Sequence, residues 1–143
     1  MKIKNYRLYI VILFILSLSI SCEQDISDED CDTYGYADCN TEEPFEAELK
    51  LNFTINSNNK RVPFQIIDGR VDNGKIIVYD TAETSEIVYV MALPYYYSVK
   101  ATYKSGDKTI FAIDGVNMKA NSIEKCDSVC WNLPTFRLDL TLQ

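Results

Sequence analysis

The chain has 143 residues, of which 14 are Lys or Arg, 21 are Asp or Glu and none is His, so its formal net charge is −7. The absence of histidine excludes Ser-His-Asp and Cys-His catalysis, histidine-ligated zinc and pH sensing by histidine. The acidic balance argues against a nucleic-acid partner, which would favour a basic face. The length allows one domain beside a short leader.

The first 21 residues have the order of a secretion signal. Met1–Arg7 is cationic, Leu8–Ile20 is an apolar run broken only by two serines, and Ser21 precedes Cys22. The run is shorter than the roughly 20 residues of a transmembrane helix, so we predict a cleaved signal peptide over 1–21. The small residues before Cys22 make this segment similar to a bacterial lipoprotein signal. The resemblance implies that Cys22 becomes the acylated first residue, and a cleaved, soluble product is the alternative.

Residues 22–44 are predicted to be an acidic tether. The segment from Cys22 to Glu48 has 11 acidic residues and no basic one. Such a segment lacks the apolar surface for a core and is kept extended by self-repulsion. An acidic run that begins at Glu23 also resembles the export signal of Bacteroidota-type lipoproteins, which implies the outer face of the outer membrane.

The net negative charge of the mature chain lies in this tether. Loss of Lys2, Lys4 and Arg7 with the signal leaves 11 basic against 21 acidic residues, a net charge of −10. From Leu49 to Gln143 there are 10 acidic and 11 basic residues. The folded domain is therefore close to neutral.

Period-two alternation predicts a series of β-strands in the rest of the chain. Every second residue of Phe45–Ile55 is apolar, as in a half-buried strand. Asp114-Gly115 is expected to end a strand, and 116–123 is ambiguous. The predicted strands are 45–55, 62–67, 76–79, 86–93, 97–103, 109–113 and 136–142.

These short strands predict an all-β fold, an antiparallel β-sandwich of about seven strands over 45–143. In Leu93–Tyr103 a tyrosine precedes alternating apolar residues, which resembles the late strand of prealbumin-like or immunoglobulin-like domains. The resemblance implies a seven-stranded Greek key and no particular chemistry. The cysteine spacing does not match the immunoglobulin inter-sheet bridge.

Four cysteines besides Cys22 are disulfide candidates in an exported protein: Cys31, Cys39, Cys126 and Cys130. We predict local pairing, Cys31 with Cys39 and Cys126 with Cys130. The second pair requires a turn, because four residues of extended strand span about 13 Å. Crossed pairing, which would pin the N-terminal tail to the C-terminal hairpin, is the alternative. A Cys₄ zinc site is disfavoured because no C-x-x-C is present.

The acidic residues predict neither a calcium site nor an enzyme. Asp28, Asp30 and Asp32 alternate like the first ligands of a calcium loop, but Thr33 and Cys39 stand where that loop needs Gly and Glu. Most carboxylates of the domain fall in predicted turns, where they stabilise the turn itself. We therefore predict no metal, no cofactor and no catalytic residue.

Aromatic residues are the remaining candidates for ligand contact. Tyr95, Tyr96 and Tyr97 are consecutive, so at least one must face solvent in a strand. We single out Tyr95, Tyr96 and Trp131, whose rings suit sugars or protein interfaces. The alternative is that Tyr97 and Tyr103 belong to the core and that Tyr95 and Tyr96 cover a sheet edge.

The predicted function is a non-catalytic, lipid-anchored binding or accessory module for an extracellular glycan or protein. A structural component of an envelope or fimbrial assembly, and a small secreted hydrolase, are the alternatives.

Overall fold

The computed structural model describes residues 31 and 39–142. The strands described here all lie in the unit Tyr36–Gln143. They are β1 (Glu46–Phe53), β2 (Val62–Asp68), β3 (Lys75–Ala82), β4 (Glu86–Ala92), β5 (Tyr95–Ser105), β6 (Lys108–Met118), β7 (Asn121–Lys125), β8 (Ser128–Asn132) and β9 (Phe136–Leu140).

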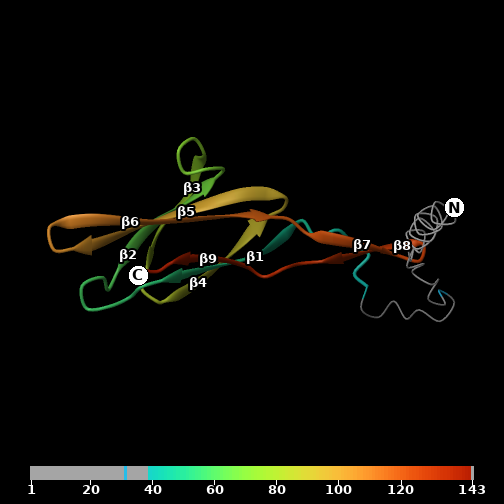
Figure 1. The fold of residues 1–143 in the computed structure, drawn as a ribbon, viewed down its shortest axis with the longest axis horizontal. Helices are drawn as coiled ribbons and strands as arrows, with labels where there is room; N and C mark the ends of the chain where they lie inside the picture. Colours follow the sequence, from blue (N-terminus) through green and yellow to red (C-terminus); the bar gives the residue numbers. More distant parts are fainter. Residues whose placement is uncertain (1–30, 32–38, 143) are drawn as a thin grey trace, which may run out of the picture. The chain divides into compact units, whose positions relative to one another are not determined.

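Two sheets form the body of this unit, and the predicted all-β sandwich is confirmed. One sheet has the strand order β3-β2-β5-β6 and the other β4-β1-β9, while β7 and β8 form a separate hairpin that extends beyond them (Figure 1). The pairs are antiparallel except β1 with β9, which is parallel. A parallel neighbour of β1 must come from far along the chain, and here the C-terminal strand supplies it.

The core lies between the inner faces of these two sheets. The alternation predicted from the sequence sets these faces: Leu49, Leu51 and Phe53 of β1 are buried, as are Val99 and Ala101 of β5. Complete burial of a large apolar side chain contributes about 1.5–3 kcal/mol. The hydrophobic effect therefore fixes which face of each strand points inward.

Tyr103 of β5 crosses the core to join the two sheets. Its hydroxyl donates a hydrogen bond to the carbonyl of Leu140 in β9 at 2.7 Å and accepts one from the backbone N–H of Thr54 at 3.1 Å. The side chain is 0 % exposed. Burial raises the pKa of this phenol, because the charged form would lose its hydration.

One sequence prediction about the C-terminal half is wrong, and one ambiguous stretch is resolved. Asp114-Gly115 does not end a strand, because β6 continues to Met118 and pairs with β5 along the full length of both. The ambiguous region after it contains the β7–β8 hairpin, so the described part of the chain has nine strands where the sequence predicts about seven. All of β7 is exposed, which explains why no hydrophobic alternation marked it.

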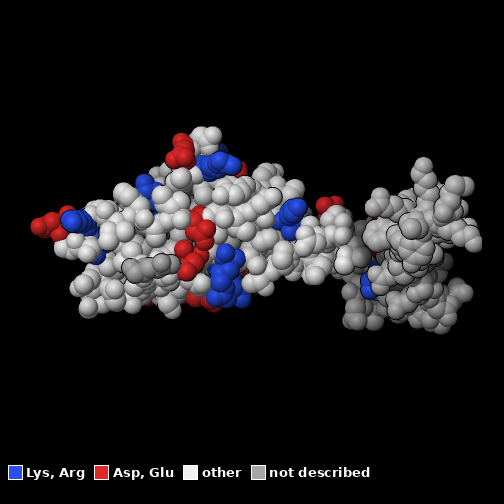
Figure 2. Space-filling view, viewed as in Figure 1, with Lys and Arg blue, Asp and Glu red and all other residues white. Residues whose placement is uncertain are grey.

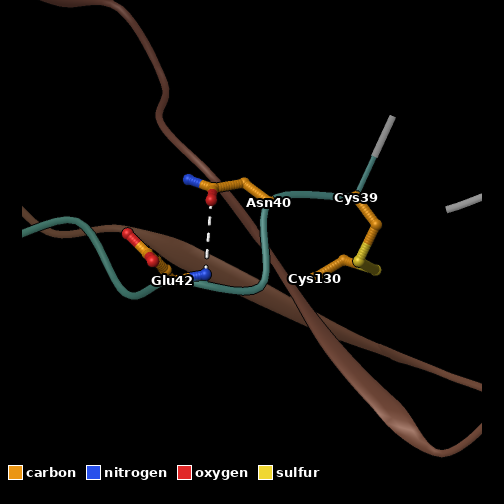
Figure 3. Close-up of a disulfide and its surroundings, with 4 residues drawn as sticks. All are labelled: Cys39, Asn40, Glu42 and Cys130. Atoms are coloured by element: carbon orange, nitrogen blue, oxygen red, sulfur yellow. Dashed lines mark hydrogen bonds between the residues drawn. A yellow bond between two sulfur atoms is a disulfide. The ribbon is translucent and has the colours of Figure 1, made fainter. Parts of the chain in front are cut away.

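The predicted local pairing of the cysteines is wrong as well. Cys39 and Cys130 form a disulfide with their Cα atoms 4.9 Å apart and a sequence separation of 91 (Figure 3). Cys126 is also in a disulfide, which is not one with Cys130. Cys126 occupies the turn of the hairpin with a φ of 51°, whereas Cys130 lies in extended β8, so no turn folds one back onto the other.

The disulfide sits where the N-terminal segment meets β8. The backbone N–H of Trp131 donates to the carbonyl of Asn40 at 2.8 Å, and the two residues form an antiparallel bridge. The side chain of Asn40 accepts a hydrogen bond from the N–H of Glu42 at 3.3 Å (Figure 3). For Cys39, the crossed alternative is therefore correct.

Several predictions concern residues outside those that the structure describes. They are the signal peptide over 1–21, the lipidated Cys22, and the stretch of the tether that contains Asp28, Asp30 and Asp32. Between residues 39 and 142, no helix has the length and apolar character that crossing a bilayer requires.

Candidate binding face

Most residues of the four-stranded sheet that point away from the core lie at the surface, while Ile67 and Ser98 among them are buried. We call this surface the outer sheet face. Its residues alternate with core residues such as Phe64 and Ala101, which pair with each other across β2 and β5. The strand registers place them in rows that cross the sheet. Taken from β3 to β6, the two central rows are Tyr79, Gln65, Lys100 and Ile113, and then Thr81, Pro63, Thr102 and Phe111.

Large apolar side chains on this face are open to solvent. Tyr79 is 70 % exposed, Phe111 52 % and Ile113 51 %. Isolated exposed apolar residues are normal on protein surfaces, but a group on neighbouring rows of one sheet marks a contact surface. The outer sheet face therefore has the apolar content of a binding site.

A shallow depression of about 260 Å³ lies on this face beside Tyr79. Polar side chains of Gln65, Thr81 and Thr102 line it together with Pro63. An amide and two hydroxyl groups can both donate and accept hydrogen bonds. The depression therefore offers an aromatic ring with polar groups beside it.

Asp80 also lines the depression, but its carboxylate is turned toward β4. It accepts a hydrogen bond from the hydroxyl of Tyr89 at 2.5 Å and another from the backbone N–H of Thr81 at 2.7 Å. The bond from Tyr89 is the main cause that lowers the pKa of Asp80. Burial, followed by the bond to Asp80, raises the pKa of Tyr89 to about 12. This pair links the edge strands β3 and β4.

Two lysines of β5 stand on the outer sheet face. The ammonium group of Lys100 lies 4.1 Å from the ring centroid of Phe111, within the range of a cation–π contact. The ammonium group of Lys104 donates to the hydroxyl of Thr109 in β6 at 2.7 Å. Neither lysine forms an ion pair with any carboxylate in the described residues.

The charges on the outer faces of the two sheets differ. On the four-stranded sheet, the outward strand positions that the structure describes hold lysines but no Asp or Glu. On the other sheet, six charged residues occupy outward positions: Glu46, Glu48, Lys50, Glu86, Arg137 and Asp139. On the side visible in Figure 2, charged side chains form separate patches on a mostly uncharged surface.

Of the predicted contact residues, only Tyr96 joins this face. It is 41 % exposed, and its hydroxyl occupies the space that a Cβ on Gly115 would need. Tyr95 is 49 % exposed on the opposite side of β5, where its ring lies 6.2 Å from that of Tyr97. Trp131 is partly buried on β8. The structure therefore does not bring the three together.

Sequence reasoning missed Tyr79, Phe111 and Ile113. Period-two alternation within the predicted strands 76–79 and 109–113 contained a signal, because Phe111 and Ile113 share a parity. That signal could not show that β3 and β6 belong to the same sheet. In the region that the structure describes, no group of three or more His, Cys, Asp or Glu side chains could hold a metal ion.

Comparisons with protein-family models, with curated proteins and with solved structures found no match for this chain.

Proposed function

We propose that this chain is a non-catalytic binding module. An acylated Cys22 anchors it to the outer membrane at the cell surface, and it binds an extracellular glycan or protein through the outer sheet face. The observation that carries the binding role is the exposure of Tyr79, Phe111 and Ile113 on adjacent rows of one sheet. The sequence of residues 1–22 supports the anchor.

The chemistry of the face supports binding over catalysis. Asp80 is the one carboxylate among the residues that line the depression, and it is engaged with Tyr89. Hydrolysis of a glycoside generally uses two carboxylates on either side of the scissile bond. Rings, hydroxyl groups and amides suit recognition of a ligand by stacking and hydrogen bonding.

A double substitution, Tyr79→Ala with Phe111→Ala, tests the binding role. The mature protein is screened on an array of glycans and extracellular proteins, and each positive ligand is titrated against wild type and variant. We expect affinity to fall about tenfold or more, since each exposed ring contributes up to about 1.5 kcal/mol beyond its buried area. Val90→Ala is the matched control, because Val90 is 63 % exposed on the outer face of the other sheet. Equal affinities for wild type and double variant would overturn the assignment of the face.

The anchor has its own test. Cys22→Ala should move the protein from the membrane fraction to the soluble fraction, because several acyl chains on one cysteine hold a domain at a membrane. Protease added to intact cells should remove the wild-type domain. A variant that stays in the membrane fraction would contradict lipidation, and full protection from protease would contradict surface exposure.

A structural role in an envelope assembly is the second candidate, and β3 favours it. β3 pairs only with β2 among the described strands, and Ile76 and Ile77 on it are 38 % and 43 % exposed. An exposed apolar edge strand is a template for addition of a strand from another chain. Ile76→Lys would block such pairing. Chemical cross-linking on cells should then no longer recover the protein in larger complexes, while its affinity for ligands of the outer sheet face should stay the same.

A further inference from the structure

We infer that the ligand of the outer sheet face is an acidic glycan, a polysaccharide that bears carboxylate or sulfate groups. This inference rests on the proposed function and narrows it to a class of ligand. It starts from the juxtaposition of Lys100, Phe111 and Tyr79 on a face whose outward strand positions hold no Asp or Glu. The carboxylate of Asp80 beside the depression is bonded to Tyr89 of the other sheet.

Charge gives the first argument. Lys100 and Lys104 project from β5 onto the outer sheet face, and no described carboxylate pairs with either. Their present partners are uncharged, the ring of Phe111 and the hydroxyl of Thr109. The domain as a whole is nearly neutral, so the lysines at outward strand positions make this face locally cationic. The lysines attract an anion to this face.

The shape and the polar groups favour a glycan over an acidic polypeptide. Tyr79 stands 70 % exposed beside a depression of only about 260 Å³ that is shallow and open. A sugar ring can lie flat on an exposed aromatic ring, with its hydroxyl groups bonded to Gln65, Thr81 or Thr102 beside it. A peptide that binds by its side chains would instead need pockets deep enough to enclose them.

The register fixes how the two kinds of contact are spaced. Tyr79 and Lys100 lie in the same row, two strands apart, with Gln65 between them. Neighbouring strands are about 4.8 Å apart, so the row places ring and ammonium group roughly 10 Å from each other at the backbone. A chain of sugar units that runs along the row would meet the ring, the amide and the ammonium group in that order.

The experiment compares polygalacturonate with its methyl ester, which has the same sugar backbone without the negative charge. Affinities for the mature protein are measured by calorimetry at low and at physiological salt, with poly-L-glutamate as the polypeptide probe. We expect binding of polygalacturonate, weaker binding at higher salt and at least tenfold weaker binding of the ester. Lys100→Gln should lower affinity about three- to fivefold, and with Lys104→Gln about tenfold.

Lys50→Gln is the matched control, because it removes one positive charge from the outer face of the other sheet. Equal loss in Lys50→Gln and Lys100→Gln would show a general charge effect and overturn the inference. Tight binding of the ester, or of poly-L-glutamate in preference to both glycans, would overturn the acidic-glycan class. In those cases sensitivity of the bound ligand to Tyr79→Ala would still uphold the proposed function. Insensitivity of every ligand to Tyr79→Ala would overturn both.

Discussion

Replacement of Tyr103 by Phe tests whether one buried hydroxyl joins the two sheets. The hydroxyl makes two hydrogen bonds, to the carbonyl of Leu140 and from the N–H of Thr54, and the side chain is fully buried. The substitution keeps the ring and leaves a carbonyl and an N–H without this partner. Each hydrogen bond contributes about 0.5–1.5 kcal/mol net, and a buried group left unsatisfied costs about 1–3 kcal/mol. We therefore expect the free energy of unfolding to fall by about 2–3 kcal/mol.

The assay is urea unfolding of the mature domain, followed by circular dichroism. With a slope of about 1–2 kcal/mol per M for a domain of this size, the midpoint should fall by roughly 1–3 M at an unchanged slope. The melting temperature should fall by about 10–15 °C. Tyr79→Phe removes a hydroxyl from an exposed ring on the same sheet, and its effect should stay within about 0.5 kcal/mol. A loss below about 0.5 kcal/mol in Tyr103→Phe would refute the role of this hydroxyl.

Two further predictions concern pH and the disulfide. The pKa of Tyr89 is raised to about 12 in the folded protein, so its contribution to stability is complete below pH 10 and is lost as pH rises through about 12. The pKa of Asp80 is lowered in the folded protein, so its contribution to stability is lost as pH falls below the ordinary value of 3.8. Absorbance of tyrosinate should show a phenol that titrates late, and Asp80→Asn should bring it closer to 10. Replacement of Cys39 and Cys130 by Ser opens a loop of sequence separation 91, which costs at most about 4–5 kcal/mol and less where another disulfide still restricts the unfolded chain. Peptide mapping without reduction should recover these two cysteines in one linked fragment, and a fragment that links Cys126 to Cys130 would contradict the structure.

The strands that build the core could be predicted from the sequence because apolar residues occupy every second, buried position in them. β1 and β9 alternate between buried and more exposed residues along their length, and β5 does so from Val99 to Tyr103. The predicted positions of these strands agree with the structure to within a few residues. The β7–β8 hairpin has no such alternation of apolar residues. It is held by its own ladder, the bridge from Asn40 to Trp131 and a disulfide, and none of these leaves an apolar repeat.

The end of β6 was missed for a different reason. Asp114-Gly115 has the composition of a turn, yet both residues pair with β5 in the middle of a long ladder. The carboxylate of Asp114 accepts hydrogen bonds from the N–H groups of Gly115 and Asp139, so it ties β6 to β9. Gly115 leaves room for the ring of Tyr96. Both residues serve tertiary contacts that local sequence rules do not contain.

The outer sheet face could not be predicted from the sequence, because its residues come from strands that are distant in the chain. Tyr79 on β3 and Ile113 on β6 enter one row only through β2 and β5 between them. The three adjacent tyrosines drew attention to one strand, where neighbours necessarily point to opposite sides. Aromatic density along a chain is therefore a poor guide to aromatic density on a sheet.

Strand β5 shows how one segment can carry both the core and the candidate site. Its buried residues include Val99 and Tyr103, while Lys100 alternates with them on the outer sheet face. Because the two sets point to opposite sides, stability and binding should respond to different substitutions. Lys100→Gln should weaken binding of polygalacturonate and leave the free energy of unfolding within about 0.5 kcal/mol of wild type. Tyr103→Phe should lower the midpoint and leave affinity unchanged below the transition. If either substitution changed both properties together, the outer sheet face would not be a surface independent of the core, and the assignment of the binding site to it would fail.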